Sequence, residues 1–90
     1  MKSNNIIAKT ARLESAIELL AEETGKVINL IVNENETNNP NKEKIEALEK
    51  KLSVLRDEKR LLSVENVDHV RTILKKYSNK TEEYEHASGL

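Results

Sequence analysis

The sequence predicts an all-α protein: an antiparallel helical hairpin of the coiled-coil type, followed by a third, short amphipathic helix. Aromatic residues make up 2% of the 90 residues and charged residues 34%, so the apolar side chains are mostly aliphatic. This composition is typical of long helices. Apolar residues also recur in alternating steps of three and four, the spacing of a coiled-coil seam. A polar segment with the one proline separates the two most regular stretches, which indicates a hairpin.

The first helix is expected over residues 6–32. Additional aliphatic residues beside its seam widen the apolar stripe, which indicates contact with more than one neighbour. Gly25 interrupts the pattern at a cost of about 1 kcal/mol relative to Ala. The positions of the seam, two of them Thr, are Ile6, Thr10, Leu13, Ile17, Leu20, Thr24, Val27 and Ile31.

The segment 33–41 is expected to be a loop, because it is rich in Asn and has no hydrophobic residue besides its proline. Pro40 suits the first turn of a following helix, and the side-chain oxygen of Asn39 is a candidate cap for its free N–H groups. The second helix is therefore expected to begin near Pro40 or Asn41.

The second helix carries a narrower seam, and Lys59 fills the one seam position that lacks an apolar side chain. We expect the aliphatic stem of Lys59 to lie along the seam while its ammonium group reaches water. The apolar members are Ile45, Leu48, Leu52, Leu55 and Leu62. Residues 61–63 are expected to break the helix, with Ser63 capping the next one, although one continuous helix is the alternative.

The third helix is expected to bury Val67, Val70, Tyr77 and either Ile73 or Leu74, and to end near Ser78. Residues 1–78 then form a single helical domain, and residues 79–90 a flexible tail, because few of the latter are apolar.

A hairpin of this kind is thin, so aliphatic side chains beside the seams must be covered by the third helix or by another chain. We expect a homodimer or a higher oligomer, with a heterologous coiled-coil partner as a further candidate. The residues predicted to form the interaction seam are Leu13, Ile17, Leu20, Val27, Ile31, Ile45, Leu48, Leu52 and Leu55.

The same residues argue against several other classes of protein. The chain has no Cys, which removes disulfides and thiolate chemistry and agrees with a cytoplasmic location. No Gly-rich phosphate loop is present, and spacing gives no Ser a base. His69 and His86 lack partners at the spacing of a helical metal site, apart from Glu82 before His86. Glu82, Glu83, Glu85 and His86 lie in the expected tail, where the entropy cost of ordering the chain opposes a metal site. We therefore expect a protein that is not an enzyme, binds no cofactor or metal, and does not enter a membrane.

Residues 9–62 resemble the coiled-coil segment that follows the zinc ribbon in large serine recombinases, the class of phage integrases and transposon resolvases. The resemblance rests on residues 27–31 (VINLI), the loop ending at Asn39–Pro40, and residues 45–52 (IEALEKKL). It implies a surface for contact with protein, because in those recombinases this segment joins subunits. The catalytic domain and the Cys ligands of the zinc ribbon have no counterpart here, so the resemblance implies a free-standing coiled-coil piece. It is either a remnant or a small protein able to engage the coiled coil of a recombinase.

The alternative hypothesis is a small DNA-associated regulator, such as a phage-encoded accessory factor or an antitoxin-like partner, that uses a basic third helix. Its candidate nucleic-acid contacts are Arg71, Lys75 and Lys76. Acidic residues lie among them, so a solvated helix face explains the same pattern. A structural or phage-assembly component is a third possibility.

Overall fold

The computed structural model describes the backbone of residues 2–87 and the side chains of residues 6–78. It contains the helices α1 (Lys2–Asn35), α2 (Lys42–Arg60) and α3 (Val67–Ala87), and the described residues form no strand. The all-α prediction with three helices is therefore confirmed. α1 begins earlier and ends later than the sequence pattern indicated, because polar residues extend the helix at both ends of its apolar stripe.

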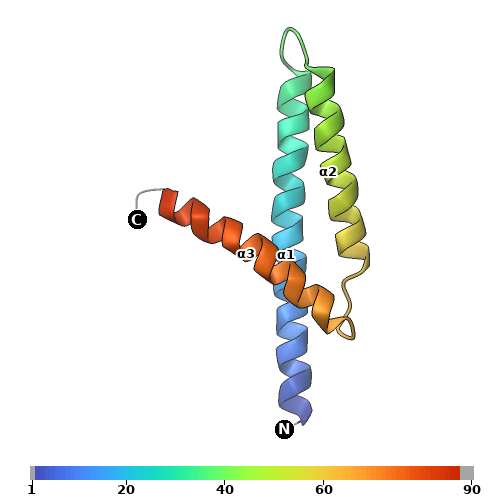
Figure 1. Ribbon diagram of the computed structural model, residues 1–90, viewed down its shortest axis with the longest axis vertical. Coiled ribbons are helices and arrows are strands. Elements are labelled where there is room, and N and C mark those ends of the chain that lie inside the picture. Colours follow the sequence, from blue (N-terminus) through green and yellow to red (C-terminus); the bar gives the residue numbers. More distant parts are fainter. Residues whose placement is uncertain (1, 88–90) are drawn as a thin grey trace.

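The three helices form a flat, elongated molecule. α2 runs back along the upper half of α1, and α3 crosses α1 obliquely lower down (Figure 1). The principal extents are 59 × 34 × 15 Å and the radius of gyration is 16.1 Å. A compact domain of this length has a radius of gyration of about 12 Å. The hairpin prediction is thus confirmed, and the thinnest dimension shows how little of the molecule is enclosed.

The turn between α1 and α2 is held by Glu34. Its carboxylate accepts a hydrogen bond from the Asn41 N–H at 3.0 Å and pairs with the Lys44 ammonium at 3.1 Å. The Asn41 side chain in turn accepts from the Lys44 N–H at 3.1 Å and caps α2. The cap predicted at Asn39 is therefore wrong, and Pro40 precedes the helix, because the Glu34 contact fixes Asn41 at its start.

The break predicted after α2 is confirmed, but the role predicted for Ser63 is not. The Ser63 hydroxyl accepts from the Glu65 N–H at 3.2 Å within a short turn, and α3 begins later, at Val67. The Asn66 side chain donates to the Leu61 carbonyl at 3.1 Å and closes the turn. α3 also continues to Ala87, past the end predicted near Ser78. The flexibility expected for residues 79–90 stays a prediction.

The core lies where α1 meets both of the other helices. Its buried members come from all three helices: Ala16, Leu20, Val27, Leu55, Val70, Ile73 and Tyr77. On α1 the predicted seam residues Leu20 and Val27 are buried, but Ala16 is buried beside them while Ile17 is 40% exposed. The core of α1 is shifted in this way because α1 packs against α3 as well as α2. Ile17 is thus not part of the core that the three helices share, and its place in the interaction seam stays a prediction.

Candidate interaction surface

A groove runs between α1 and α2, and no described residue of α3 lines it. Its lining residues are Ala21, Thr24, Gly25 and Ile28 of α1 and Leu55, Arg56 and Lys59 of α2. On α2, Arg56 and Glu58 stand on different sides of Leu55, since successive helical residues are turned by about 100°. Glu58 contacts α3, whereas Arg56 lines the groove. The groove therefore opens on the side of the hairpin that α3 leaves free.

Exposed aliphatic side chains of α1 continue this groove along the helix. Ile17 stands four residues before Ala21, and Val32 stands four residues after Ile28. Residues four apart lie on the same side of a helix, and Ala21 and Ile28 both line the groove, so all four side chains share one side of α1. The exposed fractions are 40% for Ile17, 45% for Ile28 and 44% for Val32. Contiguous exposed apolar surface of this kind marks a site of interaction with other molecules.

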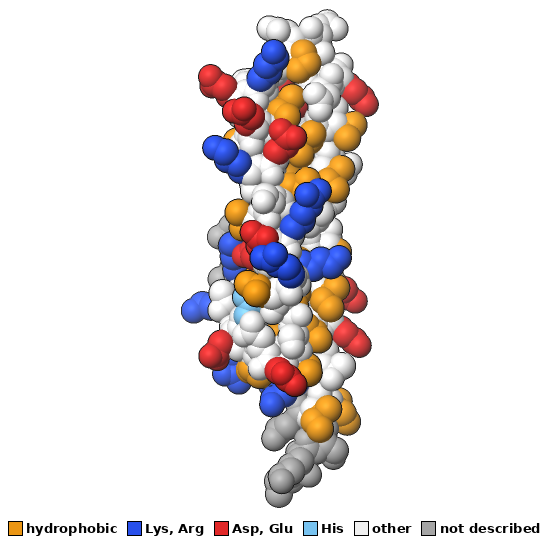
Figure 2. All heavy atoms as spheres, turned by 90° about the vertical axis from the view of Figure 1, so that its right-hand side faces the viewer, with side chains coloured by type: hydrophobic (Ala, Val, Ile, Leu, Met, Phe, Trp, Pro, Cys, Tyr) orange, Lys and Arg blue, Asp and Glu red, His pale blue; other side chains and the backbone are white. Residues whose placement is uncertain are grey.

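The second helix contributes the other half of the surface. Ile45, Leu52 and Lys59 follow one another at intervals of seven residues. This heptad spacing places their side chains on the same side of α2. Both are half-buried, and Lys59 is exposed beside Leu55. We call this surface the open face; it comprises Ile17, Ala21, Ile28, Val32, Ile45, Leu52, Arg56 and Lys59. Figure 2 shows hydrophobic side chains gathered in a band along one side of the hairpin.

A polar cluster on the other side of α2 holds α3 in place. The Glu58 carboxylate accepts hydrogen bonds from the Tyr77 hydroxyl at 2.5 Å and the Lys76 ammonium at 2.9 Å. Burial raises the pKa of Tyr77 to about 12, and the Glu58 carboxylate adds to the rise. The hydrogen bond to Glu58 also raises the pKa of Lys76. These bonds join α2 to α3, so Lys76 has a structural partner.

His69 belongs to the same cluster, through the backbone of Glu58. Its Nε2 donates to the Glu58 carbonyl at 2.8 Å. Near the end of α2 the Leu62 N–H bonds to the Lys59 carbonyl, so the Glu58 carbonyl lacks its usual helical donor. His69 supplies that donor from α3. Periodicity along the chain does not predict the His69 contact. A tyrosine on an apolar helix face does indicate that its hydroxyl needs a partner, which for Tyr77 is Glu58.

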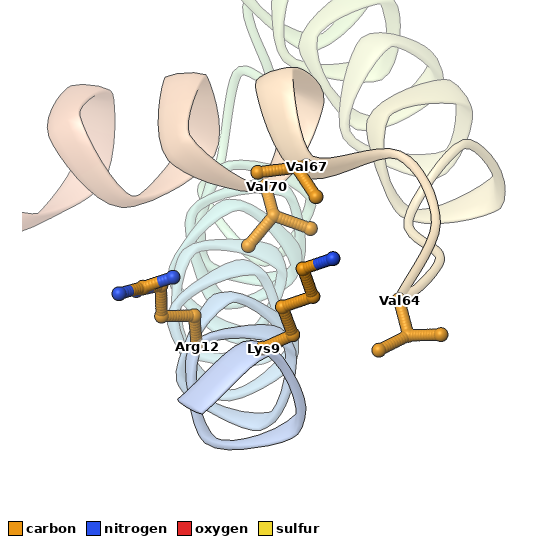
Figure 3. A pocket seen from close by; sticks show the side chains of 5 residues that line it. All are labelled: Lys9, Arg12, Val64, Val67 and Val70. Carbon is orange, nitrogen blue, oxygen red and sulfur yellow. The ribbon is translucent and has the colours of Figure 1, made fainter. Parts of the chain in front are cut away.

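The basic residues predicted as nucleic-acid contacts are divided by the fold. Arg71 and Lys75 are exposed on α3, whereas Lys76 is bound to Glu58. Lys9 and Arg12 of α1 line a small recess below Val70 of α3 (Figure 3). The crossing of the helices therefore brings α1 cations close to the first turns of α3, which spacing along the sequence does not indicate. Val64 and Val67 complete the recess.

The predicted seam residues fall into three groups. Leu20, Val27 and Leu55 are buried, and Leu13, Ile31, Leu48 and Leu52 are half-buried against the core. Ile45 is half-buried on the open face, and Ile17 is exposed there.

The described part of the chain contains neither a cluster of metal-ligating side chains nor a membrane-spanning helix. Across the described side chains, no group of three His or acidic residues is arranged to hold a metal ion. Glu82, Glu83, Glu85 and His86 lie outside the described side chains. Within the described part of the chain, none of the helices combines the length and the apolar character needed to cross a bilayer.

Comparison of the chain with protein-family models, with curated proteins and with solved structures finds no match. The resemblance to the recombinase coiled coil over residues 9–62 accordingly stays a prediction.

Proposed function

We propose that this chain is a non-enzymatic, cytoplasmic interaction module that binds another helical protein through its open face. One observation carries the proposal: exposed aliphatic side chains of α1 lie in register beside the apolar groove between α1 and α2. A groove between two antiparallel helices accepts the side-chain ridges of further helices, because ridges pack into grooves at a small set of crossing angles.

Leu30, on another side of α1, supports the choice of the open face. Its side chain is 48% exposed, about as much as that of Ile28, but it is not among the residues that line the groove between α1 and α2. A single exposed leucine is ordinary for a soluble protein, whereas a continuous stripe is not. The proposed function therefore depends on Ile28 and its neighbours and not on Leu30.

The resemblance described above names one candidate partner, the coiled-coil segment of a large serine recombinase. The VINLI stretch at residues 27–31 spans α1 at the groove, and Ile28 within it belongs to the open face. A free-standing helical hairpin with such a surface is suited to occupy the coiled coil of a recombinase subunit and so to modulate contacts between subunits.

The absence of cysteine from the chain makes a direct test simple. Ile28→Cys and Leu30→Cys each introduce a single thiol at positions of nearly equal exposure. The rate of thiol modification is measured in the dilute chain, in the concentrated chain, and with a purified recombinase coiled-coil segment. We expect protection of the Ile28→Cys thiol in at least one of the last two conditions.

The Leu30→Cys variant is the matched control and should react at the same rate throughout. Equal, unchanged rates for both thiols in all three conditions would contradict the proposed function. Protection of both thiols to the same degree would also contradict it, because that result indicates nonspecific aggregation.

A second candidate function is nucleic-acid binding by α3, favoured by the exposed Arg71 and Lys75 of α3 and by Lys9 and Arg12 of α1, which lie close to its first turns. Binding through phosphates requires several such cations and weakens steeply with salt. Replacing Arg71 and Lys75 with Ala should then remove retardation of a DNA duplex at low salt while the helical content is retained. No retardation by the unaltered chain at low salt would exclude this function.

A further inference from the structure

We propose that the open face is covered by a second copy of this chain, in a two-fold dimer whose four hairpin helices form an antiparallel bundle. In this bundle α1 of each copy lies over α2 of the other. The inference rests on the proposed function, because it takes the open face as the interaction surface and names its occupant.

The charges along the two edges of the open face are complementary. Arg56 and Lys59 line the groove on the α2 side. On the α1 side, Glu14 and Glu18 stand seven residues before Ala21 and Gly25, so the heptad spacing places them along the same edge. Among the described residues, none of these four charged side chains has an ion-pair partner.

The positions of these charges along the long axis of the hairpin favour one symmetry of the dimer over the other. Glu18 precedes Ala21 by three residues, less than one helical turn, and Ala21 lines the groove together with Arg56 and Lys59. Rotation about a two-fold axis parallel to the helices does not change the position of a residue along the helix direction, and it places α1 over α2 of the second copy. Glu18 then faces the basic edge of that copy.

The other symmetric arrangement does not use these charges. A two-fold axis perpendicular to the helices stacks α1 on α1 with inverted levels, which carries Glu14 and Glu18 away from Arg56 and Lys59 of the second copy. Their side chains would then stay without a partner across the interface. The parallel axis also gives every helix antiparallel neighbours, as in up-down bundles.

The size of the overlap sets the expected strength. The 19 residues of α2 are about 28 Å long at 1.5 Å per residue. Two packed helices are about 20 Å wide, so the flat overlap is roughly 560 Å² per copy. This area lies near the lower end for specific interfaces, and we therefore expect dissociation in the micromolar range.

The test reverses each charged edge separately. One variant carries Glu14→Lys with Glu18→Lys, and the other carries Arg56→Glu with Lys59→Glu. Sedimentation equilibrium gives the dissociation constant of each variant, of the unaltered chain, and of an equimolar mixture of the two variants. Circular dichroism of the same samples reports helical content.

We expect the unaltered chain to dimerise and each reversed variant to dimerise at least tenfold more weakly, because like charges then face each other. In the mixture, every reversed edge meets an edge of opposite charge, so mixed dimers should form with at least the affinity of the unaltered chain. Glu46→Lys with Asp57→Lys should leave the dissociation constant unchanged, because both exposed carboxylates stand two residues from a core leucine of α2 and so point away from α1 and from the open face.

Two results would overturn the proposal. The first is a monomeric unaltered chain at concentrations up to about 300 µM, well above the expected range. The second is a dimer that the α1-edge variant leaves intact, since that result selects the perpendicular axis. If the chain stays monomeric while a recombinase segment protects the Ile28→Cys thiol, the second copy is excluded and the proposed function stands.

Discussion

At the scale of single residues, Glu58 has the largest structural role outside the apolar core. Its carboxylate bonds to Tyr77 and Lys76, and its carbonyl accepts from His69, so one residue of α2 contacts three residues of α3. Sequence periodicity placed Lys59 in the seam, and it could not reveal this cluster. The contacts join residues 11 to 19 positions apart, and their geometry depends on how α3 crosses the hairpin.

The raised pKa of Tyr77 predicts how the fold responds to alkali. The folded value of about 12 lies above the usual value of 10.0, so the folded chain holds the phenol proton more tightly than the unfolded chain does. This contribution to stability is complete below about pH 10 and is lost as the pH rises through about 12. The pKa of Lys76 is raised from 10.5, so its contribution is lost in the same direction.

The shift is measurable because the chain has two tyrosines. In a Tyr84→Phe variant Tyr77 is the only phenol, and its ultraviolet titration should have a midpoint near 12. Adding Glu58→Gln should lower the midpoint while leaving it above 10, because burial remains the larger cause. A midpoint near 10 in a chain that circular dichroism shows to be helical would contradict the described cluster.

At the scale of elements, the sequence predicted which segments are helical better than it predicted which side of each helix is buried. Heptad spacing predicted a stripe on α1 in which Leu20 and Val27 are indeed buried. Ile17 of the same stripe is 40% exposed and Ala16 is buried instead, because α1 packs against two helices. The start of α2 at Lys42 agrees with the prediction near Pro40 or Asn41, but the cap predicted at Asn39 was wrong. The Glu34 carboxylate accepts a hydrogen bond from the Asn41 N–H, and this contact places Asn41 at the cap position of α2. The capping propensity of asparagine alone does not distinguish Asn41 from Asn39.

The described burial predicts a clear contrast within α1. Leu20 has no exposed surface and Leu30 is 48% exposed, so the same Leu→Ala change probes both environments. We expect Leu20→Ala to lower the free energy of unfolding by about 3 kcal/mol, because it leaves a cavity in the core. Leu30→Ala should lower it by less than about 1 kcal/mol. Chemical denaturation measures both, and equal losses would contradict the assigned core.

At the scale of the whole molecule, the chain is a two-helix hairpin covered on one side only. With α3 on that side and a thickness of 15 Å, the open face keeps Ile17, Ile28 and Val32 in contact with water. The composition predicted a small hydrophobic core, because a chain of 90 residues with 34% charged residues has too few apolar side chains to bury long helices on all sides. Which side stays open could not be predicted, because it follows from the contacts of Glu58.

The most direct test of the open face is the molar mass of the unaltered chain in solution, measured by light scattering over a range of micromolar concentrations. The account predicts a rise from the 10.3 kDa of one chain toward twice that mass as concentration increases. Ile28→Glu should hold the mass at one chain, because a carboxylate would enter the apolar interface, and Leu30→Glu should not. A mass of one chain at every concentration, or the same rise in both variants, would contradict the account.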